Sequence, residues 1–209
     1  MTKFLVVFDV DSTLIEEEVI EVLADAAGKR AEVKAITDSA MAGELDFTQS
    51  LGQRVAMLEG VSESVVAGAA SRVTITLGAV ELLREIQLRG GKVAAVSGGF
   101  IQVLEPLAEK LGLDFYRANT LEIRDGLLTG KTIGQVVDKH VKADSLRAWA
   151  AELEVPIEKT IAVGDGANDL EMMSVAGLGV AFNAKAVVRA KADIVLGSNN
   201  LADLIGLLP

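Results

Sequence analysis

The sequence feature that most constrains the fold is an unbroken apolar run that leads directly into two carboxylates. Residues 4–8 have the length and the β-branched and aromatic content of a buried strand. Their lack of polar alternation predicts that both faces are covered, as in a parallel sheet flanked by helices. Asp9 and Asp11 follow at the carboxyl end of this strand, where open α/β sheets bind ligands. Burying two neighbouring carboxylates there is unfavourable unless a cation or a reaction accounts for them.

The rest of the chain alternates strand-like apolar runs with helical periodicity. Strand-like runs recur at residues 92–97, 160–163, 179–182 and 194–196, and a hairpin signal spans 121–128. This alternation predicts a doubly wound, mostly parallel, Rossmann-like α/β sheet. Between the first strand and the next α/β unit, a helix expected at 16–27 is followed by helical segments at 31–41, 47–59 and 62–70. We therefore expect an α/β core at 1–14 and 75–209, with a helical insertion at 15–74.

The composition excludes several classes of protein. The 209 residues suffice for one domain with a sizeable core and a smaller insertion, and they include no cysteine and one histidine. Disulfides, thiolate metal sites and cysteine nucleophiles are thereby removed, and a His-rich zinc site is disfavoured. The net charge of −10 disfavours binding to nucleic acid or to an anionic membrane. With no apolar run near the ~20 residues of a membrane span and no signal-peptide pattern, we expect a cytoplasmic protein.

Polar or glycine-rich residues follow the three strongest of the predicted strands. They are Asp9 with Asp11, Ser97 with Gly98, and Asp165 with Asn168 and Asp169. Because the carboxyl ends of parallel strands lie at one edge of a sheet, we expect these three groups to form a single site. Four carboxylates gathered there would repel one another. Mg²⁺ would resolve the repulsion, since it prefers oxygen ligands and commonly bridges carboxylates to a phosphate.

The same residues suit the transfer of a phosphoryl group. Ser97 and the two glycines after it offer a hydroxyl and accessible backbone N–H groups at a strand-to-helix turn, and both bind phosphate. Lys142 and Lys139 are candidate cations to balance the charge of a phosphate. Asp9 is then a candidate nucleophile on phosphorus, through an aspartyl-phosphate. Asp11 is placed to protonate the leaving oxygen and then to activate water.

Each of these residues also has an ordinary structural explanation when it is taken alone. The aspartates could cap the next helix, and the serine–glycine segment could be a tight turn. Lys142 and Arg54 could be solvated cations, and Glu18 lies in a run of three acids that would favour a helix N-terminus. Residues 126–132 look like a P-loop but have three residues between the glycines, where four are needed. We reject the P-loop, and the convergence of several strand ends favours chemistry for the aspartates.

Four segments resemble, in order, the motifs of the haloacid-dehalogenase-like phosphatases. They are residues 9–13 (Asp-Val-Asp-Ser-Thr), residues 97–99 (Ser-Gly-Gly), Lys142 and residues 164–169 (Gly-Asp-Gly-Ala-Asn-Asp). Within that superfamily the chain resembles the phosphoserine phosphatase family, through Glu18, Met41, residues 47–51, Arg54 and residues 96–100. The resemblance implies a haloacid-dehalogenase-like core, with the helical insertion as a small cap domain.

The resemblance also implies a role for each of these residues. Asp9 would be the nucleophile and Asp11 the proton donor. Asp9, Asp165 and the backbone carbonyl of Asp11 would hold Mg²⁺, with Asp169 in support. Ser97, Gly98, Lys142 and Asn168 would hold the phosphate. Glu18 would pair with the ammonium group of the substrate and Arg54 with its carboxylate, while Met41 and Phe47 would supply apolar walls.

The implied reaction is Mg²⁺-dependent hydrolysis of phosphoserine through an aspartyl-phosphate, the last step of serine biosynthesis. Two alternatives stay open: a relative that hydrolyses or transfers the phosphoryl group of another small phosphomonoester, and a phospho-accepting signalling module. Asp11 argues against the signalling module, because an acid–base group beside the nucleophile speeds loss of the phosphate. We expect a small-molecule substrate, with a homodimer as an option. We expect no control through the N-terminal regulatory region that many bacterial relatives carry.

Overall fold

A seven-stranded sheet forms the centre of the computed structural model, which describes residues 2–41 and 44–209, apart from the side chain of Met41. The strands lie in the order β4-β3-β2-β1-β5-β6-β7, and all neighbours pair in parallel except β3 and β4. Their bounds are β1 (Leu5–Phe8), β2 (Lys92–Phe100), β3 (Phe115–Arg124), β4 (Leu127–Ile133), β5 (Thr160–Gly164), β6 (Leu178–Ala181) and β7 (Ile194–Val195). The prediction of a doubly wound, mostly parallel sheet is confirmed.

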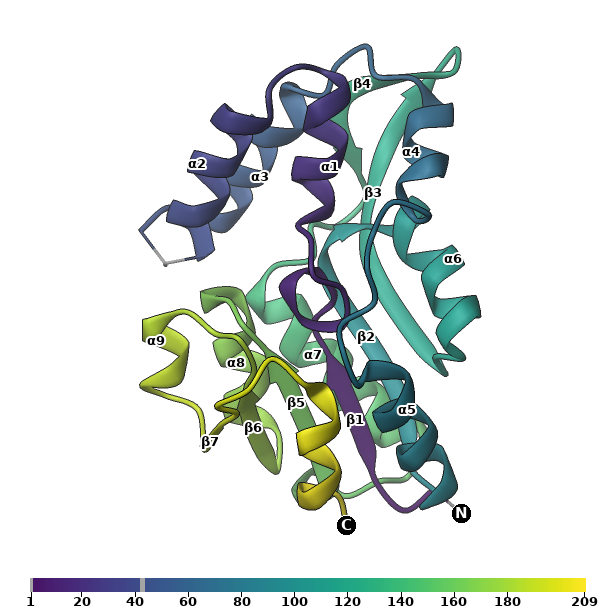
Figure 1. Cartoon of the computed structure of the whole chain (residues 1–209), viewed down its shortest axis with the longest axis vertical. Coiled ribbons are helices and arrows are strands. Elements are labelled where there is room, and N and C mark those ends of the chain that lie inside the picture. Colours follow the sequence, from purple (N-terminus) through teal and green to yellow (C-terminus); the bar gives the residue numbers. More distant parts are fainter. Residues whose placement is uncertain (1, 42–43) are drawn as a thin grey trace.

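Helices cover both faces of this sheet (Figure 1). One face carries α5 (Ala79–Leu88), α6 (Ile101–Leu111) and the 3₁₀ helix η4 (Leu201–Leu207); the other carries α7 (Lys139–Glu152), α8 (Leu170–Val175) and α9 (Ala186–Arg189). Phe4, Val6 and Phe8 pack against the first layer, whereas Leu5 and Val7 pack against the second. Alternate residues of β1 thus enter two cores, which explains its unbroken apolar sequence. No helix in the described ranges is long and apolar enough to cross a membrane.

The insertion between β1 and α5 is helical, as expected. It contains α1 (Val19–Ala26), α2 (Arg30–Met41), α3 (Phe47–Ala56) and α4 (Glu63–Ala69). In Figure 1 these helices lie together at the top of the molecule, beyond the carboxyl end of β1. They are therefore placed over the sheet edge at which the polar strand ends meet. The domain boundaries at 14/15 and 74/75 stay a prediction.

The β3–β4 hairpin reaches up from the core beside the inserted helices (Figure 1). Its two-residue turn, Asp125 and Gly126, has φ values of 51° and 76°, as a type I′ turn requires. Backbone bonds tie it to the insertion: Gly60 N donates to Leu128 O at 2.9 Å, and Leu128 N donates to Val61 O at 2.8 Å. The P-loop-like residues 126–132 belong to the turn and second strand of this hairpin, whereas a P-loop joins a strand to a helix.

The two segments that join the insertion to the core lie side by side. Glu16 N donates to Thr74 O at 3.0 Å, and the Glu17 carboxylate accepts from Thr74 N at 2.8 Å. These bonds replace the first helical turn, so the expected start of a helix at residue 16 is wrong. Helix α1 begins at Val19, and Glu18 precedes it with an extended backbone. The acidic run therefore serves the connection and the site, and only its last residue borders the helix.

Candidate active site

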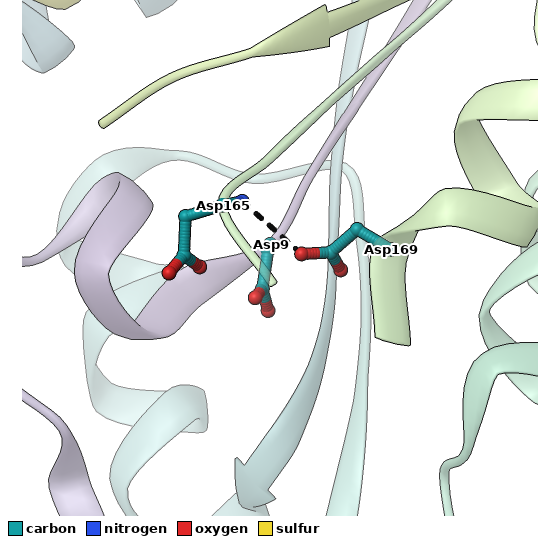
Figure 2. Close-up of side chains that lie close together, drawn as sticks. All are labelled: Asp9, Asp165 and Asp169. Carbon is teal, nitrogen blue, oxygen red and sulfur yellow. Dashed lines mark hydrogen bonds between the residues drawn. The ribbon is translucent and has the colours of Figure 1, made fainter. Parts of the chain in front are cut away.

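Strands β1 and β5 bring the acidic segments together. Asp9 follows β1 and its backbone N donates to Val163 O at 2.8 Å, which fixes it beside the end of β5 and hence beside Asp165. One carboxylate oxygen from each of Asp9, Asp165 and Asp169 lies within 4.8 Å of the other two, and all three residues are buried. In the view of Figure 2 the carboxylate of Asp9 lies between those of Asp165 and Asp169. The structure thus places these three acids together at one sheet edge, as the sequence predicts.

A buried lysine partly balances these acids. Lys142 of α7 places its Nζ 2.7 Å from Asp9 Oδ1 and 2.7 Å from Asp169 Oδ1, and its side chain is fully buried. Helix α7 is fixed at its start by Asp138, whose carboxylate accepts from the backbone N–H groups of His140 and Val141. Burial alone would lower the pKa of Lys142, but its attraction to Asp169 and Asp9 raises that pKa above the ordinary value. Lys142 is therefore held as a cation.

Asp169 organises the loop that follows β5. Its Oδ2 accepts from the backbone N of Asp165 at 3.2 Å and of Gly166 at 3.0 Å, while its Oδ1 accepts from Lys142. A Cβ at Gly164 would lie 2.5 Å from Asp169 Oδ2, so glycine is needed for this close approach. Both carboxylate oxygens of Asp169 already accept hydrogen bonds. Asp169 is therefore better suited to hold the loop around a metal ion than to bind the ion directly.

The positive charge of Lys142 does not neutralise the carboxylates gathered around it. Burial raises the pKa of Asp9 to about 7, with repulsion from Asp169 adding to the effect and Lys142 opposing it. Burial also raises the pKa of Asp165 well above its ordinary value, helped by Asp9 and Asp169. For Asp11, burial and then repulsion from Glu18 and Asp9 raise the pKa in the same way. A site of this kind gains stability from protons or from a cation.

We expect the protein without metal to lose stability as the pH rises from about 4 to about 7. The folded pKa of Asp9, about 7, lies above its unfolded value of 3.8, so the folded state binds more protons than the unfolded chain between these limits. Stability therefore falls as the pH rises through this window. Urea unfolding in EDTA across the range measures the fall, and Mg²⁺ should reverse it above about pH 7. Equal stability with and without Mg²⁺ above that pH would count against a cation site.

The donor set suits a hard divalent cation such as Mg²⁺. Carboxylate and carbonyl oxygens are its preferred ligands. Asp11 Oδ1 and Asn168 Oδ1 are also buried, with no hydrogen-bond partner among the described residues, so the site holds further unsatisfied acceptors. The carboxylate of Asp11 is not one of the three clustered acids, and its expected contribution is the backbone carbonyl. The residues fit a bound metal ion, and Mg²⁺ as its identity stays a prediction.

The end of β2 forms the neighbouring wall. Ser97 Oγ accepts from Gly99 N at 2.7 Å, and Asn119 Nδ2 donates to the Gly98 carbonyl at 2.8 Å. Asn119 Oδ1 in turn accepts from Val137 N at 2.8 Å, shortly before α7 begins. Asn119 thus joins the serine–glycine turn to the segment that positions Lys142. A Cβ at Gly99 would lie 2.9 Å from an Asp11 carboxylate oxygen, so glycine allows this turn to approach Asp11.

The inserted helices supply the opposite wall. Glu18 accepts a 2.8 Å hydrogen bond from Ser12 Oγ, and Ser12 lies in the left-handed region at φ 56°. Arg54 of α3 is 2% exposed, and its Nη2 has no hydrogen-bond partner in the part of the chain that the structure describes. Burial raises the pKa of Glu18 and lowers that of Arg54. The carboxylate of Glu18, just before α1, and the guanidinium of Arg54 on α3 therefore face the same interior.

A narrow pocket connects these walls. It is lined by Asp9, Asp11, Glu18, Ile20, Phe47, Leu51, Arg54, Ser97, Gly98, Gly99, Phe100 and Asn168. The ring of Phe47 lies 5.9 Å from the Arg54 guanidinium carbon, and its Cζ would be 2.6 Å from a Cβ at Gly98. The insertion therefore closes directly onto the serine–glycine turn. The side chain of Met41, also expected here, lies outside the described part of the structure.

Comparison with known proteins decides the family. The model of the haloacid dehalogenase-like hydrolases matches residues 6–174, a span that contains all four sequence motifs. The chain belongs to the haloacid dehalogenase-like hydrolase family. A solved structure of a phosphoserine phosphatase, as a phospho-aspartyl intermediate analogue, matches this hydrolase with a TM-score of 0.97 at 42% identity over 100% of both chains. The expected family and fold are thereby confirmed.

Relatives of this haloacid dehalogenase-like hydrolase carry the same name as that structure. A phosphoserine phosphatase of Streptococcus thermophilus is 48% identical over 206 residues, which are 99% of this chain and 96% of the relative. A phosphoserine phosphatase of Mycobacterium tuberculosis is 49% identical over 207 residues, which are 99% of this chain but 51% of the relative. The chain thus spans about half the length of the mycobacterial protein.

Most of the predicted site residues of this hydrolase line the same pocket, and Asp165, Asp169 and Lys142 lie next to Asp9 without lining it. Lys142 contacts carboxylates and is not among the described residues that line the cavity, so its contact with phosphate stays a prediction. Sequence reasoning missed Ser12 and Asn119. Each positions another site residue through a hydrogen bond that only the folded chain creates. For Ser12 the sequence did hold a signal, because it lies within the motif at residues 9–13.

Proposed function

We propose that this chain is a Mg²⁺-dependent phosphatase that hydrolyses O-phospho-L-serine to serine and phosphate through an aspartyl-phosphate at Asp9. The observation that carries the proposal is that Asp9, Ser97, Glu18 and Arg54 line the same pocket. Relatives named phosphoserine phosphatase support it. The reaction would form serine as the last step of its biosynthesis, and we expect it in the cytoplasm.

In the first half of the reaction, Asp9 attacks phosphorus. Val10 N and Lys142 both contact Asp9 Oδ1, so we assign the attack to Oδ2. The bond from Oδ2 to phosphorus forms as the bond from phosphorus to the serine oxygen breaks. Asp11, whose pKa burial raises well above its ordinary value, is protonated and gives its proton to that oxygen. Serine leaves as a neutral alcohol, and Asp11 is left as a carboxylate.

In the second half, water replaces Asp9 on phosphorus. The Asp11 carboxylate takes a proton from the water as its oxygen bonds to phosphorus, and the bond from phosphorus to Asp9 Oδ2 breaks. Phosphate leaves, Asp9 is again a carboxylate and Asp11 is again protonated. Lys142 holds Asp9 in place throughout from its buried position. Bound Mg²⁺ supplies the positive charge that lets an anionic phosphate enter a site rich in carboxylates.

Selectivity for an amino acid rests on the insertion. Glu18 offers an anion to the substrate ammonium group, and Arg54 offers a planar guanidinium to its carboxylate. The Nη2 of Arg54, buried and without a hydrogen-bond partner among the described residues, supports this assignment, because such a group gains most from an anionic partner. Phe47 and Leu51 supply apolar surface that keeps water from the closed cavity.

Changing Arg54 to alanine should reduce hydrolysis of phosphoserine far more than hydrolysis of phosphoethanolamine, which keeps the ammonium group but lacks the carboxylate. We expect kcat/KM to fall on the order of 10²-fold for phosphoserine and by less than about threefold for phosphoethanolamine, because one charge-assisted contact is lost. Steady-state kinetics on both substrates measure the difference. Gln53→Ala, at the exposed neighbouring position, is the matched control. A uniform loss would mean that Arg54 holds the insertion or the phosphate instead.

A substrate panel tests the proposed function itself. Phosphoserine, phosphothreonine, phosphoethanolamine and two sugar phosphates are compared by phosphate release with Mg²⁺ and with EDTA. We expect phosphoserine to be hydrolysed fastest, and only with the metal. Equal rates on sugar phosphates would overturn the substrate assignment and favour the alternative of another small phosphomonoester.

A further inference from the structure

Arg54 is held by a residue to which the site described so far gives no role. Thr37 of α2 is 1% exposed, and its Oγ1 accepts a 3.1 Å hydrogen bond from Arg54 Nη1. The same hydroxyl donates to the carbonyl of Val33, one helical turn earlier, at 3.0 Å. The proton of the hydroxyl is therefore committed to its own helix, and the oxygen lone pairs are turned to the guanidinium.

The remaining contacts of Arg54 leave one nitrogen to a ligand. Nε donates to the backbone carbonyl of Ser50 at 3.2 Å, and the guanidinium lies 5.9 Å from the Phe47 ring centre. Both partners belong to α3, the helix of Arg54 itself, whereas Thr37 belongs to α2. Thr37 is thus the contact that fixes the guanidinium relative to a second helix. With Nε and Nη1 occupied, Nη2 is buried without a partner among the described residues.

We propose that Thr37 is a positioning residue that sets selectivity for the substrate carboxylate by orienting Arg54. This inference rests on the proposed function. The planar guanidinium gives its best contact to a carboxylate only at a fixed angle, and the hydrogen bonds from Nε and Nη1 fix that angle. The β-branch of threonine and its bond to Val33 restrict χ1, so the acceptor itself is pre-oriented. Arg54 then meets the substrate without first having to be ordered.

Thr37→Val keeps the shape of the side chain and removes the acceptor. We expect KM for phosphoserine to rise on the order of tenfold with kcat changed less than about twofold, since a hydrogen bond to a charged group is lost. Both constants for phosphoethanolamine should stay within about twofold of the parent. Thr37→Ser, which keeps the hydroxyl, should restore most of the affinity for phosphoserine. Adding Thr37→Val to Arg54→Ala should cause no further loss, because both changes act through the same contact.

The outcomes separate this proposal from the proposed function. A parent enzyme that hydrolyses phosphoserine no better than phosphoethanolamine overturns both. A parent that discriminates, with a valine variant that discriminates equally well, overturns the role of Thr37 alone. A valine variant that loses activity equally on both substrates, with a lower melting temperature, shows a structural role and also overturns it. If the valine variant does not fold, Thr37→Ala, which favours the helix, takes its place with the same expected results.

Discussion

Changing Asp9 to asparagine should reduce phosphate release from phosphoserine by about 10⁴-fold or more, the scale seen when a nucleophile is removed. The amide keeps the shape of the side chain, but its oxygen is a poor nucleophile and forms no acyl-phosphate. The variant should stay folded, because the pKa of about 7 that burial gives Asp9 means that its negative charge is costly in this site. Phosphate release under saturating phosphoserine and Mg²⁺ measures the loss, and circular dichroism checks the fold.

Asp144→Asn is the control for this change. Asp144 is an exposed carboxylate on α7, paired with Arg147, and it is neither one of the clustered acids nor a residue that lines the pocket. The Asp144→Asn variant should therefore release phosphate at the parental rate. An Asp9→Asn variant that retains more than about 1% of the parental rate would remove Asp9 as the nucleophile. Slow deamidation to aspartate would appear as a rate that grows during storage, and mass spectrometry identifies it.

Replacing Lys142 with methionine should have the largest effect on stability. Its ammonium group touches two buried carboxylates at 2.7 Å each and has no exposed surface. Removing one partner of a buried ionic cluster leaves uncompensated charge and costs about 3–5 kcal/mol. We expect the free energy of unfolding in urea to fall by about that amount in EDTA, and phosphate release to be lost.

Lys139→Met provides the matched comparison, since Lys139 lies three residues earlier on the same helix and is exposed. Its change should alter stability by less than about 0.5 kcal/mol. Mg²⁺ should recover part of the stability lost in the Lys142 variant, because a cation again faces Asp9. Equal stability of the two methionine variants in EDTA would show that the buried carboxylates do not depend on Lys142.

The sheet and its helical insertion could be predicted from the sequence because local pattern and tertiary environment agree there. The apolar run of β1 is buried on both sides, and the hairpin turn at Asp125 and Gly126 needs the conformation that these residues favour. Prediction failed where long-range contacts replaced local ones. The acids before α1 look like a helical first turn, but their backbone pairs with the returning chain at Thr74.

The candidate site likewise contains residues that could be predicted from the sequence and residues that could not. Asp9, Asp165 and Ser97 could be predicted to meet because parallel strands place their carboxyl ends at one edge. Lys142 could be preferred to the other lysines only because of its place in the order of the motifs. Its burial between two carboxylates depends on how α7 packs. Thr37 and Asn119 gave no signal, since a hydrogen bond between distant helices or strands leaves no periodic trace in the sequence.

The central claim is that Asp9 carries the phosphoryl group during turnover, and trapping that intermediate tests it most directly. The protein is mixed with ³²P-labelled phosphoserine and Mg²⁺, quenched in acid within the first turnover and treated with borohydride, which reduces an aspartyl-phosphate to homoserine. The account predicts labelled protein after the quench and, after reduction, homoserine at position 9 in the peptide that contains residues 4–14. Turnover with homoserine at another aspartate, or with no acid-stable label on the protein, would contradict it.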